Sequence, residues 1–173
     1  DITKIKKYTF CNCSGLSSVT IPNSVTEIGD YAFYGCSGLT EVTIPNSVTT
    51  INDSAFGGCS NLNTIIIEDG ATSISLGYTY NYNNEYDSPF GDCLLKEVYI
   101  GRNTISSKAL PFKGLKNLTS VVLGNYVTSI DADAFAYCIG LTTITIPNSV
   151  TKIGDNAFIN CGELVSITIP SSV

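Results

Sequence analysis

Apolar and polar positions recur along this chain with a period of about 23 residues. Seven phenylalanines mark the period: Phe10, Phe33, Phe56, Phe90, Phe112, Phe135 and Phe158. Six of them are followed three residues later by a cysteine, and Phe112 is followed by Leu115 at that position. Because self-similarity at a fixed period is typical of stacked repeats, the sequence predicts about seven repeat units.

Each unit contains a short alternation of apolar and polar residues. In the second unit Leu39, Val42 and Ile44 form the pattern L-x-x-V-x-I, whose second half alternates as a β-strand does. In four units a proline follows directly, and since proline cannot donate to a strand ladder, we expect the strand to end there. These prolines are Pro22, Pro45, Pro147 and Pro170.

The segment between strands predicts a turn with helical spacing. Ala55, Cys59 and Leu62 are separated by four and three residues, which places them on one face of a short helical or 3-10 turn. Acidic residues three positions before a phenylalanine fit the N-cap of such a turn, where a carboxylate accepts hydrogen bonds from free backbone amides. These residues are Asp30, Asp53, Asp87 and Asp155.

One strand and one turn cannot bury their apolar side chains alone, so the units must stack. In a stack, equivalent residues lie about 4.8 Å apart and form continuous internal columns. We therefore predict an α/β solenoid as a single domain over residues 1–173. Its parallel β-sheet should line the concave face, with the short helical or 3-10 turns on the wider, convex face.

The unit L-x-x-V-x-I-P-x-S-V-x-x-I-x-x-x-A-F-x-x-C-x-x resembles the leucine-rich repeat of the BspA type over nearly the whole chain. The resemblance implies a right-handed leucine-rich-repeat coil and brings no catalytic motif with it. It also implies a cell-surface or secreted protein that adheres to host proteins or to other cells. Because the chain begins within a unit and ends just after a strand, we interpret it as a fragment of a longer repeat array.

Charge and hydropathy argue against nucleic-acid and membrane partners. The formal net charge is −6, and the basic residues are scattered except at Lys4, Lys6 and Lys7, whereas a nucleic-acid groove needs clustered positive charge. No apolar run approaches the roughly 18 residues of a transmembrane helix, so we expect no membrane insertion.

The residue types also argue against an enzyme. The chain has no histidine, which removes the commonest general base and metal ligand. Two carboxylate pairs, Asp131 with Asp133 and Glu85 with Asp87, fall in capping or loop contexts and lack a nucleophile with its base. We expect no catalytic activity and no cofactor.

Six of the seven cysteines occupy one internal column, and Cys11 alone lies outside it. Cys11 and Cys13 resemble half of a zinc site, but neither a second closely spaced pair nor a histidine completes it. Parallel stacked side chains have poor geometry for disulfides, so we expect no disulfides. We interpret the column as small buried hydrophobic residues, since Leu115 substitutes within it, and Cys11 as the candidate exposed thiol.

One unit carries an insertion. Eleven more residues separate Ile74 from Phe90 than separate Ile51 from Phe56, and we assign the insertion to residues 75–89. Its tyrosines, which offer large contact area at small entropic cost, predict a binding loop. An alternative is a β-hairpin or lid that packs these side chains on the flank of the solenoid itself, and the alternation T-Y-N-Y-N favours a strand there. The tyrosines are Tyr78, Tyr80, Tyr82 and Tyr86.

The outward positions of the predicted strands are mostly threonine and serine. In three middle units they become Ile66, Tyr99 and Val122, in one lateral row. An apolar row on a hydroxyl-covered surface predicts a partner site, to which we add Glu97. The alternative is that three unrelated apolar residues happen to lie on neighbouring strands.

Two functions fit these patterns. The leading hypothesis is a protein-interaction or adhesion module, which binds a host extracellular or other cell-surface protein through the concave face and the inserted loop. The alternative is a structural spacer or stalk, whose parent protein carries its binding functions outside this segment.

Overall fold

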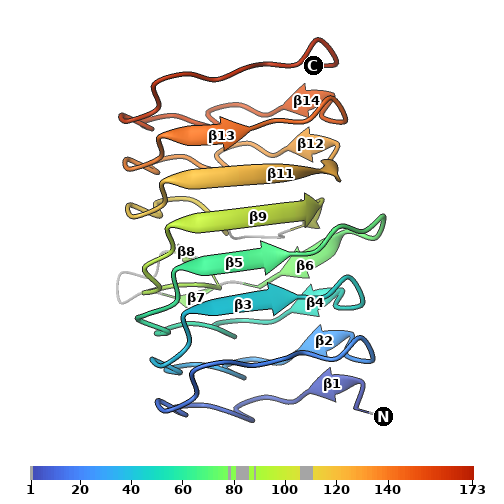
Figure 1. The fold of residues 1–173 in the computed structure, drawn as a ribbon, viewed down its shortest axis with the longest axis vertical. Coiled ribbons are helices and arrows are strands. Elements are labelled where there is room, and N and C mark those ends of the chain that lie inside the picture. The colour runs from blue at the N-terminus through green and yellow to red at the C-terminus, as the bar shows by residue number, and fades with distance from the viewer. Residues whose placement is uncertain (1, 78, 81–85, 88, 106–110) are drawn as a thin grey trace.

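The chain folds into a parallel β-solenoid that winds in a right-handed sense (Figure 1). The computed structural model describes residues 2–77, 79–80, 86–87, 89–105 and 111–173. The coil has about six turns, which correspond to the six intervals in the stack of seven phenylalanines. The predicted stack of repeats is confirmed.

Five parallel strands form the sheet that we call the long sheet. These strands are β3 (Glu41–Ile44), β5 (Thr64–Ile67), β9 (Glu97–Arg102), β11 (Ser120–Tyr126) and β13 (Thr143–Thr145). Their side chains alternate, so that Val42 and Ile44 are buried whereas Glu41 is exposed. Neighbouring strands are in register, as in the pairing of Ile65 with Val42 and with Val98. The L-x-x-V-x-I pattern therefore predicted these strands correctly.

Strand length in the long sheet depends on proline and glycine. β3 has four residues and stops before Pro45, which cannot donate to the ladder. β9 has six residues and β11 has seven, because Gly101 and Gly124 occupy the place of the proline. A Cβ atom at Gly101 would collide with the backbone of Asp69 in the preceding coil, so glycine lets the two coils lie close together.

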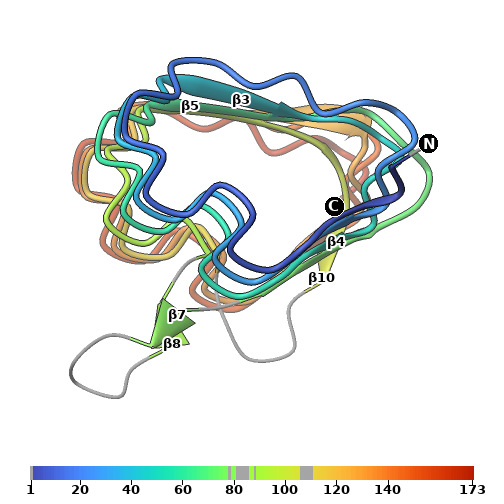
Figure 2. The same cartoon turned by 90° about the horizontal axis from the view of Figure 1, so that it is seen from below.

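Seven short strands run along the opposite side of the coil (Figure 2). Five of them form one sheet, which we call the short sheet: β1 (Lys4–Ile5), β2 (Glu27–Ile28), β4 (Thr50–Ile51), β6 (Ile74–Leu76) and β10 (Thr104–Ile105). The other two, β12 (Ser129–Ile130) and β14 (Lys152–Ile153), form a separate parallel pair. The short sheet thus ends at β10, whereas the long sheet continues through β9 and β11.

The segments around the phenylalanines are turns, and no helix occurs in the described ranges, so the predicted helical or 3-10 turns are not confirmed there. In the third unit Ser54 and Gly58 adopt φ angles of 52° and 68°, and the same positions recur with positive φ in other units. A right-handed helix does not continue through such residues. Alternate amides bond to the next coil instead, as in the 2.8 Å bond from the amide of Phe33 to the carbonyl of Ala55.

The acidic residues before the phenylalanines consequently do not cap helices. Asp30 forms an ion pair of 3.2 Å with Lys7, and its backbone carbonyl accepts a 3.0 Å hydrogen bond from the amide of Tyr8. The carboxylate therefore acts between neighbouring coils and not within one turn.

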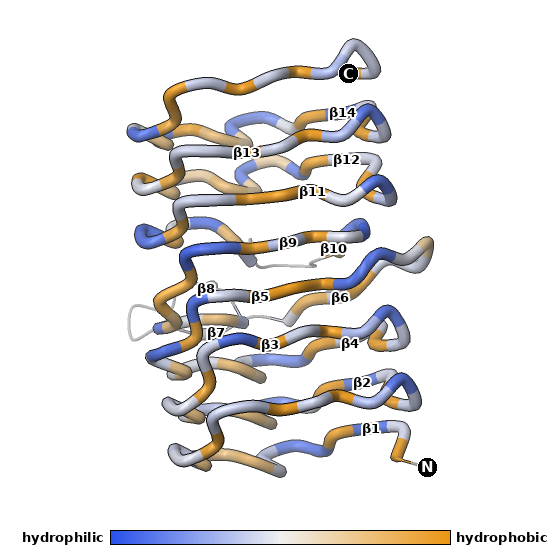
Figure 3. Tube along the Cα trace, in the orientation of Figure 1, coloured by the Kyte–Doolittle hydropathy of each residue, from blue (hydrophilic) through white to orange (hydrophobic). Residues whose placement is uncertain are grey.

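Identical side chains form internal columns, so that apolar residues recur at the same places in successive coils (Figure 3). The phenylalanine rings stack with centroids 5.1 to 6.1 Å apart. Phe33, Phe56 and Phe90 are completely buried, whereas Phe10 in the first coil is 36% exposed and stacks on one neighbour, Phe33. Full burial of such a side chain contributes about 1.5–3 kcal/mol, so the column is a principal source of stability.

The cysteines of the internal column have polar partners. The Sγ atom of Cys59 donates a 3.1 Å hydrogen bond to the carbonyl of Phe33 in the preceding coil. Cys36, Cys93, Cys138 and Cys161 make the equivalent bond. Burial raises the pKa of the Cys36 thiol to about 11 and that of Cys138 to about 12. All seven cysteines are free thiols.

The insertion forms a hairpin outside the coil. Its strands β7 (Thr79–Tyr80) and β8 (Tyr86–Asp87) pair in antiparallel orientation. The hairpin that the alternation predicted is confirmed for these residues. Viewed along the solenoid axis, it projects from the side of the coil that faces away from the long sheet (Figure 2).

The insertion begins later than the sequence predicted. Ser75 and Leu76 belong to β6, where they pair with Thr50 and Ile51 of β4. The predicted alignment placed Ile74 beside Ile51, but the loop after β5 is two residues longer than in the preceding coil. The boundary at residue 75 is therefore wrong by at least two residues.

Candidate functional site

The outer face of the long sheet carries the predicted apolar row. Ile66 pairs with Tyr99, and Tyr99 pairs with Val122, so these residues lie side by side on three strands. Val122 is 38% exposed, and Ile66 and Tyr99 are half-buried. Thr43 pairs with Ile66 at one end, and Thr145 pairs with Val122 at the other. The structure thus places together the three residues that sequence reasoning grouped, and threonines border them.

Tyr99 is fixed in place by a hydrogen bond. Its hydroxyl donates to Oδ1 of Asp69 at 2.8 Å. The pKa of the Tyr99 phenol is raised above its ordinary value. Partial burial is the larger cause, and the hydrogen bond to Asp69 is the second. A Cβ atom at Gly124 would lie 2.7 Å from the Tyr99 hydroxyl, so glycine is needed beside this contact. A ring already held in place loses less conformational entropy when a partner binds.

Acidic side chains flank the row. Glu97 is exposed and pairs with Thr64 on one neighbouring strand and with Ser120 on the other. Glu41 is also exposed, and it pairs with Thr64 from the opposite side, in the same lateral row. Among the described strands of the long sheet, no outward position is lysine or arginine. The face therefore combines an apolar row with negative charge.

The tyrosines of the insertion are only partly described. Tyr80 lies opposite Tyr86 in the hairpin, and their backbones alone are placed. Tyr78 and Tyr82 lie outside the described residues. Because the hairpin and the long sheet project from opposite sides of the coil, the row and the hairpin do not lie on the same face, although the leading hypothesis assigned both to one binding function (Figure 2).

A buried arginine is the main feature that sequence reasoning missed. Arg102 is 0% exposed, and its Nη atoms donate to the carbonyls of Asn46 at 2.8 Å and Pro45 at 3.0 Å. Burial lowers the pKa of its guanidinium, although the nearby Glu68 carboxylate acts in the opposite direction. Glu68 in turn accepts a 3.0 Å bond from the amide of Asn46.

The sequence did contain a signal for this cluster. A column of buried valines follows the long-sheet strands in other units and includes Val25, Val48, Val127 and Val150. After β5 the corresponding segment has Ala71, which is exposed, and at the end of β9 it has Arg102. The loss of an apolar column position therefore marks the place where the arginine side chain enters.

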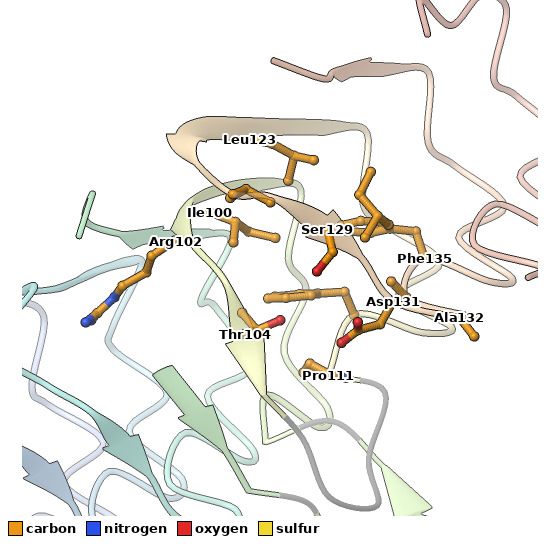
Figure 4. Close-up of a pocket in the computed structure, with 13 residues that line it drawn as sticks. Ile100, Arg102, Thr104, Pro111, Leu123, Ser129, Asp131, Ala132 and Phe135 are labelled. Carbon is orange, nitrogen blue, oxygen red and sulfur yellow. The ribbon is translucent and has the colours of Figure 1, made fainter. Parts of the chain in front are cut away.

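A cavity of about 360 Å³ opens where the short sheet ends (Figure 4). The side chain of Asn103 replaces the backbone ladder between β10 and β12: its Oδ1 accepts from the amide of Thr128 and its Nδ2 donates to the Thr128 hydroxyl, both at 2.9 Å. Internal apolar residues line the cavity: Ile100, Phe112, Leu123, Val127, Ile130 and Phe135. Sequence reasoning did not detect this cavity.

The carboxylate pairs that were considered for catalysis and rejected are only partly described. Asp133 lies 3.9 Å from the ammonium of Lys113, and Glu85 is outside the described residues. Within the described ranges, no group of three or more cysteine, aspartate or glutamate side chains could hold a metal ion. In those ranges there is also no helix long and apolar enough to cross a membrane.

The stacked coils, the parallel long sheet and the columns of phenylalanine and leucine define a leucine-rich-repeat solenoid. The model of the BspA type leucine-rich repeat region matches residues 1–86 and 86–173 in six copies, and the chain belongs to this family. The resemblance read from the sequence is thereby confirmed.

Solved structures show the same fold. A leucine-rich repeat protein from Bacteroides ovatus is 28% identical, with a TM-score of 0.68, and the match covers 100% of this chain and 42% of that protein. The T. pallidum leucine-rich repeat protein TpLRR is 25% identical, with a TM-score of 0.66 and coverages of 94% and 72%. This chain therefore spans less than half the length of the B. ovatus protein. Comparison with curated proteins gives no match.

Proposed function

We propose that this chain is a protein-interaction module that binds a partner protein through the outer face of the long sheet. Leucine-rich-repeat proteins generally serve as protein-interaction modules. The observation that carries the proposal is the row of Ile66, Tyr99 and Val122 in direct register. Apolar and aromatic side chains gathered on a polar surface supply most of the free energy of protein binding.

The flanking charges define the chemistry of the partner. With Glu41 and Glu97 exposed beside the row, a complementary surface has an apolar centre and basic residues at its rim. Complementary rim charges speed association and make it sensitive to salt. We propose that the partner is a host extracellular or another cell-surface protein, and that this chain is itself displayed on a cell surface or secreted.

The hairpin is a second contact element in this proposal. Since it lies on the other side of the coil, its tyrosines would contact a different partner, or a different part of one that wraps around the solenoid. The row alone is the site that the first experiment addresses.

The experiment compares binding of matched variants to a panel of immobilised extracellular-matrix and cell-surface proteins. We expect Ile66→Asp combined with Val122→Asp to weaken capture at least about tenfold, because both changes place charge within the apolar contact. The control combines Thr20→Asp with Thr168→Asp, two exposed positions on the first and last coils that add the same charge. Equal loss in both double variants would exclude the row as the binding site.

A spacer is the second candidate, and the unbroken phenylalanine stack favours it. Rings at 5.1 to 6.1 Å spacing and backbone bonds between coils make a stiff rod that can hold other domains apart. If the parent protein keeps its full binding activity when both Asp substitutions are present in the row, the spacer function is supported instead.

A further inference from the structure

The cavity between β10 and β12 has a physical origin in a polar residue at a core position. Thr104 pairs with Ile74, whose side chain is completely buried, so threonine occupies a place where the neighbouring coil has isoleucine. The following residue, Ile105, pairs with Ser75 and is 57% exposed. The coil of β10 therefore lacks apolar volume toward the next coil, and the missing volume becomes the cavity.

Three oxygen-bearing side chains face this space. Figure 4 shows the oxygens of Thr104, Ser129 and Asp131 turned toward the cavity, while the guanidinium of Arg102 points away from it. Among the described residues, none of these three side chains forms a hydrogen bond within the protein. An apolar wall beside convergent, unpaired polar groups is the usual composition of a small-molecule site.

The charge of the lining selects the ligand. Asp131 contributes a carboxylate, and the one cationic residue among the described residues of the lining, Arg102, is already bonded to Pro45 and Asn46. The two hydroxyls accept or donate hydrogen bonds, so the polar side favours a ligand that donates and carries positive charge. A cavity of about 150 Å³ holds a benzene ring, so 360 Å³ accommodates a ring with a short chain.

We propose that this cavity binds a small molecule that joins an aromatic ring to a primary amine, with the ring against Phe112 and Phe135 on the apolar wall and the amine at Asp131. This site is independent of the proposed binding of a protein at the long sheet. The two sites lie on different sides of the coil, so either can be wrong without affecting the other.

The test uses three probes with the same apolar body: phenethylamine, 2-phenylethanol and phenylacetate. Binding is followed by NMR titration of the whole chain. We expect phenethylamine to bind about threefold more tightly than the alcohol, a ratio consistent with a partly solvated ion pair, and phenylacetate to bind least. Resonances of Thr104, Phe112 and Ser129 should shift.

Variants decide the assignment. Asp131→Asn should abolish the preference for the amine over the alcohol, while Asp155→Asn, which removes an exposed carboxylate outside the cavity, should leave the preference unchanged. Thr104→Phe should fill the space and reduce the affinity for all three probes at least tenfold. The proposal is overturned if no probe shifts the cavity resonances, or if Asp131→Asn retains the preference for the amine. The second criterion holds even if Thr104→Phe fails to fold.

Discussion

The guanidinium of Arg102 donates a 3.0 Å hydrogen bond to the carbonyl oxygen of Pro45, two strands away across the long sheet. Another Nη atom bonds to Asn46 beside it and reaches the carbonyl of Thr72, in the intervening coil, at 3.5 Å. One side chain thus joins three consecutive coils in a fold where most contacts are between nearest neighbours.

Replacing Arg102 should destabilise the protein strongly. We expect Arg102→Ala to lower the free energy of unfolding by about 2–4 kcal/mol, because buried carbonyls lose their donors and a void remains. Arg102→Met should cost less, since it restores apolar volume without the charge. Urea denaturation measures both changes. Lys116→Ala, at an exposed lysine, is the control and should change stability by less than about 0.5 kcal/mol.

The phenylalanine column should show a gradient of sensitivity from its centre to its end. Phe56 is fully buried between Phe33 and Phe90, so Phe56→Ala should cost about 3–5 kcal/mol. Phe10 is 36% exposed and stacks on one ring, so Phe10→Ala should cost less than half as much. Equal losses in thermal or urea unfolding would contradict the view that stacking between coils supplies this stability.

Alkaline pH should destabilise the fold through the buried thiols. The pKa of Cys138 is raised to about 12 in the folded state, from a model-peptide value near 8.5. Unfolding therefore releases a proton between these values, and stability present below about pH 8.5 is lost as the pH rises towards 12.

The measurement compares urea unfolding of the wild type with Cys138→Val at pH 7, 9 and 10.5. We expect the wild type to lose up to about 1.4 kcal/mol more per pH unit than the variant above pH 9. Parallel pH profiles for the two proteins would show that Cys138 does not titrate in this way.

The phenol of Tyr99 should titrate at lower pH when Asp69 is changed. Its pKa is raised by partial burial and by the bond to Asp69, so Asp69→Asn should bring it part of the way back. NMR of ring-labelled tyrosine follows this titration. Asp155→Asn, at an exposed carboxylate remote from the long sheet, should leave it unchanged. An unaltered Tyr99 titration in Asp69→Asn would mean that burial alone sets the pKa.

Features that repeat were predictable from the sequence, because the phenylalanines and the alternation of Leu39, Val42 and Ile44 recur at a fixed spacing along the chain. The helical form predicted for the turns is not confirmed, and there is a specific reason. The spacing of Ala55, Cys59 and Leu62 fits a helix as well as a chain that reverses direction every few residues. The left-handed φ angles of Ser54 and Gly58 decide between the two, and Ser54 gives no sign of that conformation in its residue type.

Features that depend on register between coils were harder to predict. The row of Ile66, Tyr99 and Val122 could be predicted because the three residues occupy the same position of the strand pattern in three successive units. The contact of Arg102 with Pro45 spans units of different loop length, and the cavity at Thr104 arises from a break in pairing that no single unit displays. The opposite placement of the hairpin and the row requires the path of the whole coil.

The end of the short sheet at β10 has a consequence for how the chain folds. In a linear array, cooperativity passes from each coil to the next through the contacts that they share. Between the coils of β10 and β12 those contacts include the long sheet, the Phe112–Phe135 pair at 5.7 Å and the side chain of Asn103. The coils before and after this junction should therefore behave as two foldons, with the earliest opening detected by hydrogen exchange at the junction itself.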